Sequence, residues 1–126
     1  LAAWSRVAAF DSDGLAVSAL RRAAAVPGFK PLVAERRDLY RRPLVASELE
    51  PFDAAVLDPP FEGAAAQVAE LARSAVPQIR YVSCNPASFA RDAKALIAGG
   101  YSLTTVTPVD QFLYSAHVEL VGAFAR

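Results

Sequence analysis

The sequence predicts an α/β fold with a mostly parallel sheet, helices on both faces of that sheet, and an antiparallel pair of strands at its C-terminal end. Two observations support this class. Up to Gly100, short apolar runs typical of buried strands alternate with alanine-rich stretches whose apolar residues recur at helical spacing. From Tyr101 onward, two β-rich stretches flank a loop, and no helical spacing separates them.

The N-terminal part is predicted to form a strand, a helix and a second strand. The apolar run over residues 6–10 ends at Asp11 and is typical of a buried strand. Ser12 or Asp13 is a suitable N-cap for a helix that reaches residue 26, where Pro27-Gly28 ends it. Residues 31–34 are predicted to form the second strand, which leads into a charged stretch.

The central part contains a third strand and a second helix. The apolar run over residues 52–57 is predicted to end as a strand at Asp58-Pro59-Pro60, because two prolines continue neither a helix nor a central strand. The alanine-rich stretch over residues 63–74 has the composition of a helix.

The C-terminal part is predicted to add a strand, a helix and the antiparallel pair. The strand covers residues 79–83. Asn85 is a good N-cap and Pro86 suits the first helical position, so a helix is expected over residues 86–98, ended by Gly99-Gly100. The stretches that complete the sheet are residues 101–109 and 117–124.

Composition narrows the class of protein. The 126 residues suit one domain, and 13 basic residues balance 13 acidic ones, which argues against a nucleic-acid binder that relies on bulk positive charge. A single cysteine excludes an internal disulfide framework, and we expect no metal site. The apolar runs are too short for a membrane helix and no secretory signal is present, so a cytoplasmic protein is expected. Because methionine is absent, we expect a fragment of a longer protein.

Polar side chains follow the predicted strands at the edge where α/β sheets bind ligands. Asp11 has the chemistry to accept both ribose hydroxyls of a nucleoside cofactor, or it merely caps the next helix. Asp38 has the chemistry to receive an adenine amino group, although a mixed run of charges such as the one around it is more often a solvated surface. Asp58 is a more specific signal, since the two prolines after it fix the backbone and aim a carboxylate at the ligand edge.

Two further residues suggest covalent chemistry. Cys84 precedes a predicted helix N-terminus, whose dipole favours a thiolate nucleophile, whereas the alternative is a buried structural cysteine. Glu119 lies in an apolar strand, two residues after His117 and therefore on the same face. An acid in such surroundings suits a general base, and the alternative is a solvated glutamate at a sheet edge.

Several motifs together resemble one known family, the SAM-dependent RNA (uracil-5-)-methyltransferases, in the C-terminal part of their catalytic domain. The motifs that carry the resemblance are Tyr81-Val-Ser-Cys-Asn-Pro-Ala87, Arg91-Asp92, Gly100-Tyr101, Pro108-Val-Asp110, Phe112 and His117-Val-Glu119, together with Asp11 and Asp58-Pro59-Pro60. The resemblance covers nearly the whole chain. It implies a Rossmann-like class I methyltransferase sheet, S-adenosylmethionine as cofactor, and tRNA or rRNA as the partner and substrate.

The resemblance also implies roles for individual residues. Cys84 would be the nucleophile that adds to carbon 6 of uracil, and Glu119 would accept the proton from carbon 5. Asp58 would lie between the methyl donor and the base. Asp11 and Asp38 would contact the ribose and adenine of the cofactor, and His117 and Asp110 would support Glu119.

This sequence departs from the family pattern at the residue after the two prolines and in the segments expected before Leu1. Phe61 stands where the family usually has arginine. The glycine-rich SAM loop, the first strand of the sheet and the RNA-binding barrel are expected upstream, where some members also carry an iron–sulfur cysteine cluster. Because the missing strand would lie between the strands that end at Asp11 and Asp58, we expect both to expose edges, through which the chain self-associates unless another segment fills the gap.

Two other functions compete with this interpretation. Asp58-Pro59-Pro60-Phe61 resembles the motif of methyltransferases that act on amino nitrogens of adenine or cytosine, which need no cysteine. A non-catalytic RNA-binding remnant would explain the missing SAM loop. Neither alternative explains why Cys84 and Glu119 both occur.

Overall fold

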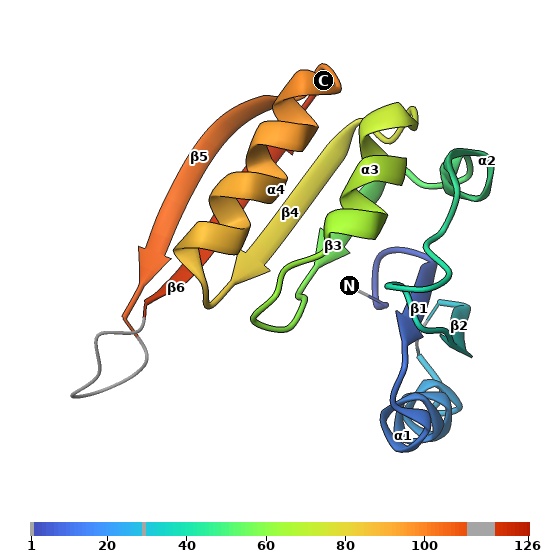
Figure 1. Cartoon of the computed structure of the whole chain (residues 1–126). Helices are drawn as coiled ribbons and strands as arrows, with labels where there is room; N and C mark the ends of the chain where they lie inside the picture. The colour runs from blue at the N-terminus through green and yellow to red at the C-terminus, as the bar shows by residue number, and fades with distance from the viewer. Residues whose placement is uncertain (1, 29, 111–117) are drawn as a thin grey trace. The chain divides into compact units, whose positions relative to one another are not determined.

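The computed structural model describes residues 2–28, 30–110 and 118–126, and the chain divides into two compact units, Leu1–Arg42 and Pro43–Arg126. Strands and helices alternate along both units, so the predicted α/β class is confirmed (Figure 1). Within the described ranges, no helix combines the length and apolar character that a membrane crossing requires.

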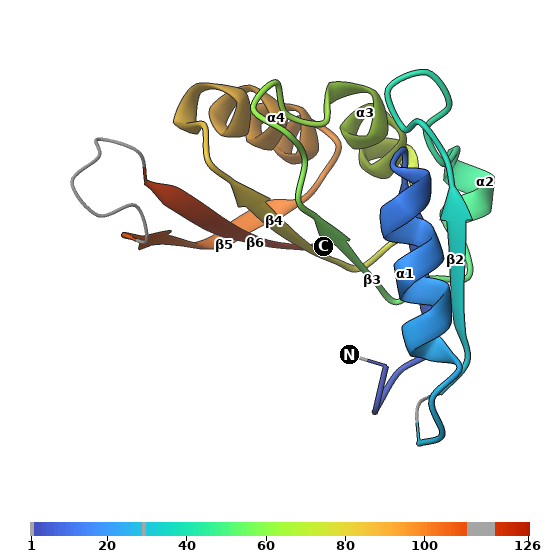
Figure 2. The same ribbon diagram turned by 90° about the horizontal axis from the view of Figure 1, so that it is seen from below.

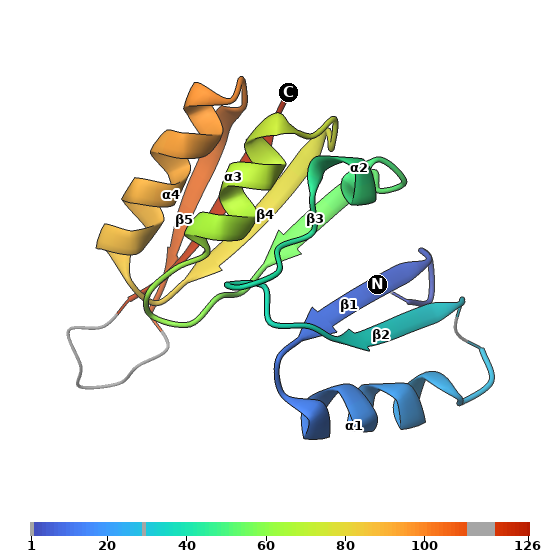
Figure 3. The same cartoon turned by 45° about the vertical axis from the view of Figure 1, so that its right-hand side comes forward.

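The N-terminal unit is a parallel pair of strands connected by one helix (Figure 3). β1 (Val7–Asp11) pairs along its whole length with β2 (Leu32–Arg36). α1 (Gly14–Ala24) begins where the Asp13 carboxylate accepts hydrogen bonds from the backbone N–H groups at positions 15 (2.7 Å) and 16 (3.3 Å). Asp13 is therefore the N-cap, as one of the two predicted candidates, although the helix ends before residue 26.

The C-terminal unit contains a four-stranded sheet with the order β3-β4-β6-β5. Its strands are β3 (Ala54–Leu57), β4 (Gln78–Ser83), β5 (Ser102–Val109) and β6 (Glu119–Ala125). β3 and β4 are parallel, and β6 is antiparallel to both β4 and β5, so β6 alone runs against the other three. The predicted mostly parallel sheet with a C-terminal antiparallel pair is thus confirmed.

The two longer helices of this unit cover one face of its sheet. α3 (Ala65–Arg73) and α4 (Pro86–Ala98) lie on the same face of the four-stranded sheet (Figure 2). The reason is topological: right-handed crossovers from β3 to β4 and from β4 to β5 advance in the same direction across the sheet, which puts both connecting helices on one side. A short helix that the sequence analysis did not predict, α2 (Ala46–Leu49), precedes β3.

The core lies between these two helices and the sheet face they cover. Its fully buried side chains come from both helices, from β4, from β6 and from the segments that join them. They include Val68, Leu71, Val76, Ile79, Tyr81, Leu96 and Phe124. The ring of Phe89 on α4 packs edge-on against Tyr81, with centroids 5.6 Å apart. The core therefore fixes α4 against β4, and with it the junction that carries Cys84.

Among the described strands, four have a partner on one side only. β2 and β5 are two of them, and the others are β1, which pairs with β2 alone, and β3, which pairs with β4 alone. The unpaired edges of β1 and β3 are the two that were expected from the sequence.

Candidate active site

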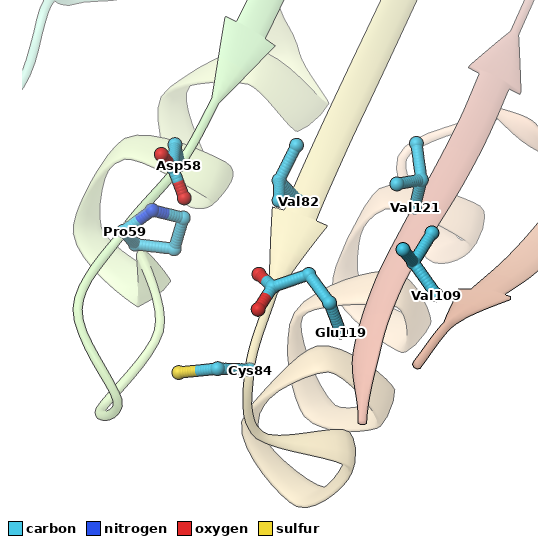
Figure 4. Close-up of a pocket in the computed structure, with 7 residues that line it drawn as sticks. All are labelled: Asp58, Pro59, Val82, Cys84, Val109, Glu119 and Val121. Carbon is cyan, nitrogen blue, oxygen red and sulfur yellow. The ribbon is translucent and has the colours of Figure 1, made fainter. Parts of the chain in front are cut away.

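A pocket of about 500 Å³ opens at the carboxyl ends of β3 and β4 in the C-terminal unit. Three polar side chains project into it from different strands, and apolar side chains form the remainder of its wall (Figure 4). The residues that line it are Asp58, Pro59, Val82, Cys84, Val109, Glu119 and Val121.

Strand direction explains why the three polar residues meet. Asp58 and Cys84 come directly after β3 and β4, whose carboxyl ends lie at the same edge because the strands are parallel. Glu119 is the first residue of β6, which is antiparallel to β4 and therefore begins where β4 ends. These three residues were expected at one site, and the structure places them around one pocket.

The pocket lies on the sheet face that α3 and α4 leave uncovered. Val82 pairs with Val121 across β4 and β6, and Val109 pairs with Glu119 across β5 and β6, so these side chains share a face. The neighbouring Tyr81 points the other way, into the core. The valines give the pocket an apolar wall, against which a flat aromatic or pyrimidine ring can pack.

The three polar groups offer distinct chemistry. Cys84 is a free, half-buried cysteine, which can act as a nucleophile when it is a thiolate. Glu119 is also half-buried, and its carboxylate can take a proton. Asp58 is exposed at the mouth of the pocket. A thiol and a carboxylate on one pocket are the kinds of group that covalent catalysis uses.

The start of α4 positions Cys84. The Asn85 side-chain oxygen accepts a hydrogen bond from the backbone N–H of Ala87 (3.0 Å), and Pro86 occupies the first helical position. The Asn85 N–H donates to Ser83 Oγ (3.2 Å), which closes a tight turn around Cys84. The predicted helix over residues 86–98 and its cap are confirmed.

A buried carboxylate behind the pocket was not singled out from the sequence. Asp92 is 1% exposed, and it accepts hydrogen bonds from Tyr81 Oη (2.6 Å), from the backbone N–H of Ala64 (2.7 Å) and from Arg91 Nε (2.9 Å). Burial, and then the hydrogen bond to Asp92, raise the pKa of Tyr81 well above its usual range. The Arg91-Asp92 pair had appeared only as part of a motif, because nothing in the sequence shows which loop it contacts.

The other candidate residues lie outside this pocket. Asp11 and Asp38 belong to the N-terminal unit, at the carboxyl ends of β1 and β2. Asp11 Oδ1 accepts a hydrogen bond from the backbone N–H of Asp13 (2.7 Å), and Asp38 Oδ1 accepts one from the N–H of Tyr40 (3.0 Å). His117 lies outside the described residues. In the part of the chain that the structure describes, no group of His, Cys, Asp and Glu side chains is arranged to hold a metal ion.

Other proteins are similar to this chain in sequence and in fold. The family model for tRNA (uracil-5-)-methyltransferases matches residues 17–125. An uncharacterized RNA methyltransferase of Rhizobium meliloti is 54% identical over 100% of this chain, which corresponds to 31% of the relative. A second, from Caulobacter vibrioides, is 49% identical over the same shares of both chains. The chain thus spans about a third of the length of these relatives.

A solved structure matches as well. The tRNA (uracil-54, C5)-methyltransferase of Pyrococcus abyssi, crystallised with S-adenosyl-L-homocysteine, superposes with a TM-score of 0.80 and 31% sequence identity. The match covers 97% of this chain and 29% of the Pyrococcus abyssi chain. The two chains therefore share a fold over the aligned region.

Proposed function

The chain belongs to the tRNA (uracil-5-)-methyltransferase family, and on this premise we propose that it supplies the catalytic residues for methyl transfer from S-adenosylmethionine to carbon 5 of a uridine in tRNA or rRNA. We further propose that its 126 residues are the C-terminal portion of a catalytic domain; that they match about 30% of each relative supports their being a portion. The observation that carries the proposal is the presence of Cys84 and Glu119 on one pocket.

Cys84 performs the first step. Carbon 5 of uracil is too weak a nucleophile to accept a methyl group directly. The Cys84 thiolate forms a bond to carbon 6, and the electron pair of the carbon 5–carbon 6 double bond moves into an enolate, which makes carbon 5 nucleophilic. When bound, S-adenosylmethionine supplies the methyl group.

Glu119 completes the reaction. After methylation, carbon 5 carries both the methyl group and its original proton. The Glu119 carboxylate takes that proton, the electron pair restores the carbon 5–carbon 6 double bond, and the thiolate leaves carbon 6. The half-buried position of Glu119 on the same pocket as Cys84 supports this role.

Three aspartates are proposed to hold the cofactor. Carboxylates at the carboxyl ends of strands suit the hydroxyl and amino groups of a nucleoside. Asp11 uses Oδ1 for its own loop and has a second oxygen for the ribose. Asp38 would receive the adenine amino group, and Asp58 would lie between donor and base. Asp38 Oδ1 already accepts hydrogen bonds from the N–H groups of Tyr40 and Arg41 (3.3 Å), so fewer lone pairs of its carboxylate are left for the adenine amino group.

The test is covalent trapping in the complete gene product that contains this chain. The protein is incubated with S-adenosylmethionine and RNA that carries 5-fluorouridine, and covalent protein–RNA adducts are mapped by mass spectrometry. A base cannot remove fluorine from carbon 5 as it removes a proton, so the thiolate cannot leave carbon 6. We therefore expect a methylated adduct at Cys84 that disappears in Cys84→Ala. With ordinary uridine, Glu119→Gln should accumulate the same adduct, whereas Glu50→Gln, a change at an exposed glutamate, should not.

Other outcomes would favour other functions. Methyl transfer to RNA without an adduct, unaffected by Cys84→Ala, would favour the amino-nitrogen chemistry that Asp58-Pro59-Pro60-Phe61 resembles. Binding of RNA without any transfer would favour a non-catalytic role. Comparing tRNA with rRNA as methyl acceptor identifies the substrate.

We also propose that the 126-residue chain by itself self-associates and binds S-adenosylmethionine poorly. The unpaired edges of β1 and β3 support this, because open strand edges pair with other chains. Light scattering that shows a stable monomer at all concentrations would contradict it.

A further inference from the structure

The loop that connects β3 to α3 is fastened to α4 through its backbone. The loop covers residues 58–64 and carries Asp58 and Pro59 on the pocket wall. Its carbonyl and N–H groups have partners on the first turns of α4 and on the cap of that helix. Each of these partners is a side chain that lies close in sequence to Cys84.

The contacts succeed one another along the loop. The Phe61 carbonyl accepts a hydrogen bond from Asn85 Nδ2 (2.9 Å) and lies 3.1 Å from Ser88 Oγ. The Glu62 carbonyl accepts from Arg91 Nη2 (2.8 Å). The backbone N–H of Ala64 donates to Asp92 Oδ2 (2.7 Å). Three successive parts of the loop are therefore held by one helix and its cap.

Charge and burial make this attachment rigid. Arg91 contacts Asp92 Oδ1 with Nε (2.9 Å) and Nη2 (2.8 Å) while it also holds the Glu62 carbonyl, so three contacts restrain its guanidinium. Asp92 is buried and is held from behind by Tyr81 Oη. Asn85, Ser88, Arg91 and Asp92 are hereafter called the loop clamp.

The clamp also leaves no room for a side chain at Gly63. This residue has φ +83°, and a Cβ built on it would lie 2.6 Å from both Arg91 Nη2 and Asp92 Oδ2. The loop backbone thus lies directly on the ion pair.

We propose that the loop clamp is a set of positioning residues that fixes Asp58 and Pro59 at a set distance from Cys84. This inference rests on the proposed function. Asn85 connects the two sides of the pocket, because it follows Cys84 directly and its side chain holds the Phe61 carbonyl. The clamp acts on the loop backbone, so it positions the wall of the pocket whatever side chain occupies position 61. A misplacement of about 1 Å at such a wall lowers turnover by up to about a hundredfold.

The test compares Arg91→Ala with Gln67→Ala in the complete gene product. Gln67 is a suitable control because its side chain also holds a backbone segment of this unit, with hydrogen bonds to the N–H (2.8 Å) and carbonyl (3.0 Å) of Leu44, and it does not line the pocket. Hydrogen–deuterium exchange of a peptide containing residues 61–64 reports the loop directly. Methyl transfer to RNA, measured as kcat and KM, reports the pocket.

In Arg91→Ala we expect the amides of residues 61–64 to exchange about tenfold faster, and kcat to fall about tenfold with little change in the KM for RNA. Arg91→Lys keeps the positive charge, so it should restore part of the slow exchange at residues 61–64 and part of kcat. Gln67→Ala should change neither. If Arg91→Ala does not fold, Ser88→Ala replaces it as the test variant. Ser88→Ala removes one hydroxyl, and we expect it to change exchange and kcat in the same direction but by less.

Two results would overturn the inference. If exchange at residues 61–64 is the same in wild type and in the Arg91 and Ser88 variants, the clamp does not hold the loop. If exchange rises but kcat matches that of Gln67→Ala, holding the loop does not matter for catalysis. Absence of methyl transfer by the wild-type protein would instead refute the proposed function, and the exchange comparison would still decide whether the clamp holds the loop.

Discussion

Removing the hydroxyl of Tyr81 should destabilise the C-terminal unit by more than the loss of an ordinary hydrogen bond. The side chain is 0% exposed, and its hydroxyl donates to the buried Asp92 carboxylate at 2.6 Å. A hydrogen bond to a charged group contributes about 1.5–3 kcal/mol, against about 1 kcal/mol for a neutral pair. Since Asp92 keeps its bonds to Ala64 and Arg91 in Tyr81→Phe, we expect a loss of about 2 kcal/mol in the free energy of unfolding.

The same substitution should change how stability depends on alkaline pH. Burial and the Asp92 carboxylate raise the pKa of Tyr81, whereas in the unfolded chain it titrates near its ordinary value of about 10. Above that pH the unfolded state has lost the proton and the folded state retains it. The stability that Tyr81 contributes is therefore complete below about pH 10 and falls by about 1.4 kcal/mol per pH unit above it. Phenylalanine has no proton to lose, so this part of the slope should vanish.

Urea unfolding of wild type and Tyr81→Phe between pH 7 and pH 11 measures both effects. Tyr101→Phe is the matched control, because Tyr101 is also buried but donates to the neutral carbonyl of Val76 (2.6 Å). It should cost about 1 kcal/mol at pH 7. The reasoning is refuted if Tyr81→Phe costs no more than Tyr101→Phe, or if it keeps the wild-type alkaline slope.

Three other substitutions test the local packing and capping. Gly99→Ala should lower the free energy of unfolding by about 1–3 kcal/mol in a thermal denaturation assay, because its Cβ would lie 2.6 Å from the backbone oxygen of Ala72. Gly14→Ala is the control and should be tolerated in the same assay, because a Cβ at Gly14 would have no atom nearer than 3.5 Å. Asp13→Ala should cost about 1 kcal/mol through loss of the α1 cap, measured by circular dichroism during urea unfolding. Phe61→Arg should change stability by less than about 0.5 kcal/mol, because the ring is 54% exposed; a large drop in melting temperature would show that the ring, and not only its carbonyl, anchors the loop.

The sequence was sufficient to predict features that depend on neighbours along the chain. Asp13 and Asn85 cap helices by bonds that span two or three residues, so their positions follow from local chemistry. Asp58 and Cys84 were predicted to lie at one edge because strand ends in an α/β sheet meet there, and the family resemblance implied that Glu119 acts at the same site. Their common pocket agrees with that rule, while their roles in catalysis remain predictions.

Features that depend on distant contacts were not predicted. The contact between Asp92 and Ala64 spans 28 positions, and no local pattern at either residue indicates the other. The placement of α3 and α4 on one face depends on the order of strands in the sheet, which hydrophobic periodicity does not encode. The helix at residues 46–49 is too short to produce a periodic signal.

The position of β6 in the sheet determines when the C-terminal unit can assemble during translation. β6 comes after the other strands of this sheet in sequence, yet it lies between β4 and β5, and among the described strands it is the only partner of β5. During translation, the edges of β4 and β5 that face β6 therefore stay unpaired until residues 119–125 have emerged from the exit tunnel of the ribosome. β3 and β4 can pair earlier, but the sheet is completed only when β6 is available, so open strand edges that favour aggregation persist until late in the synthesis of this unit.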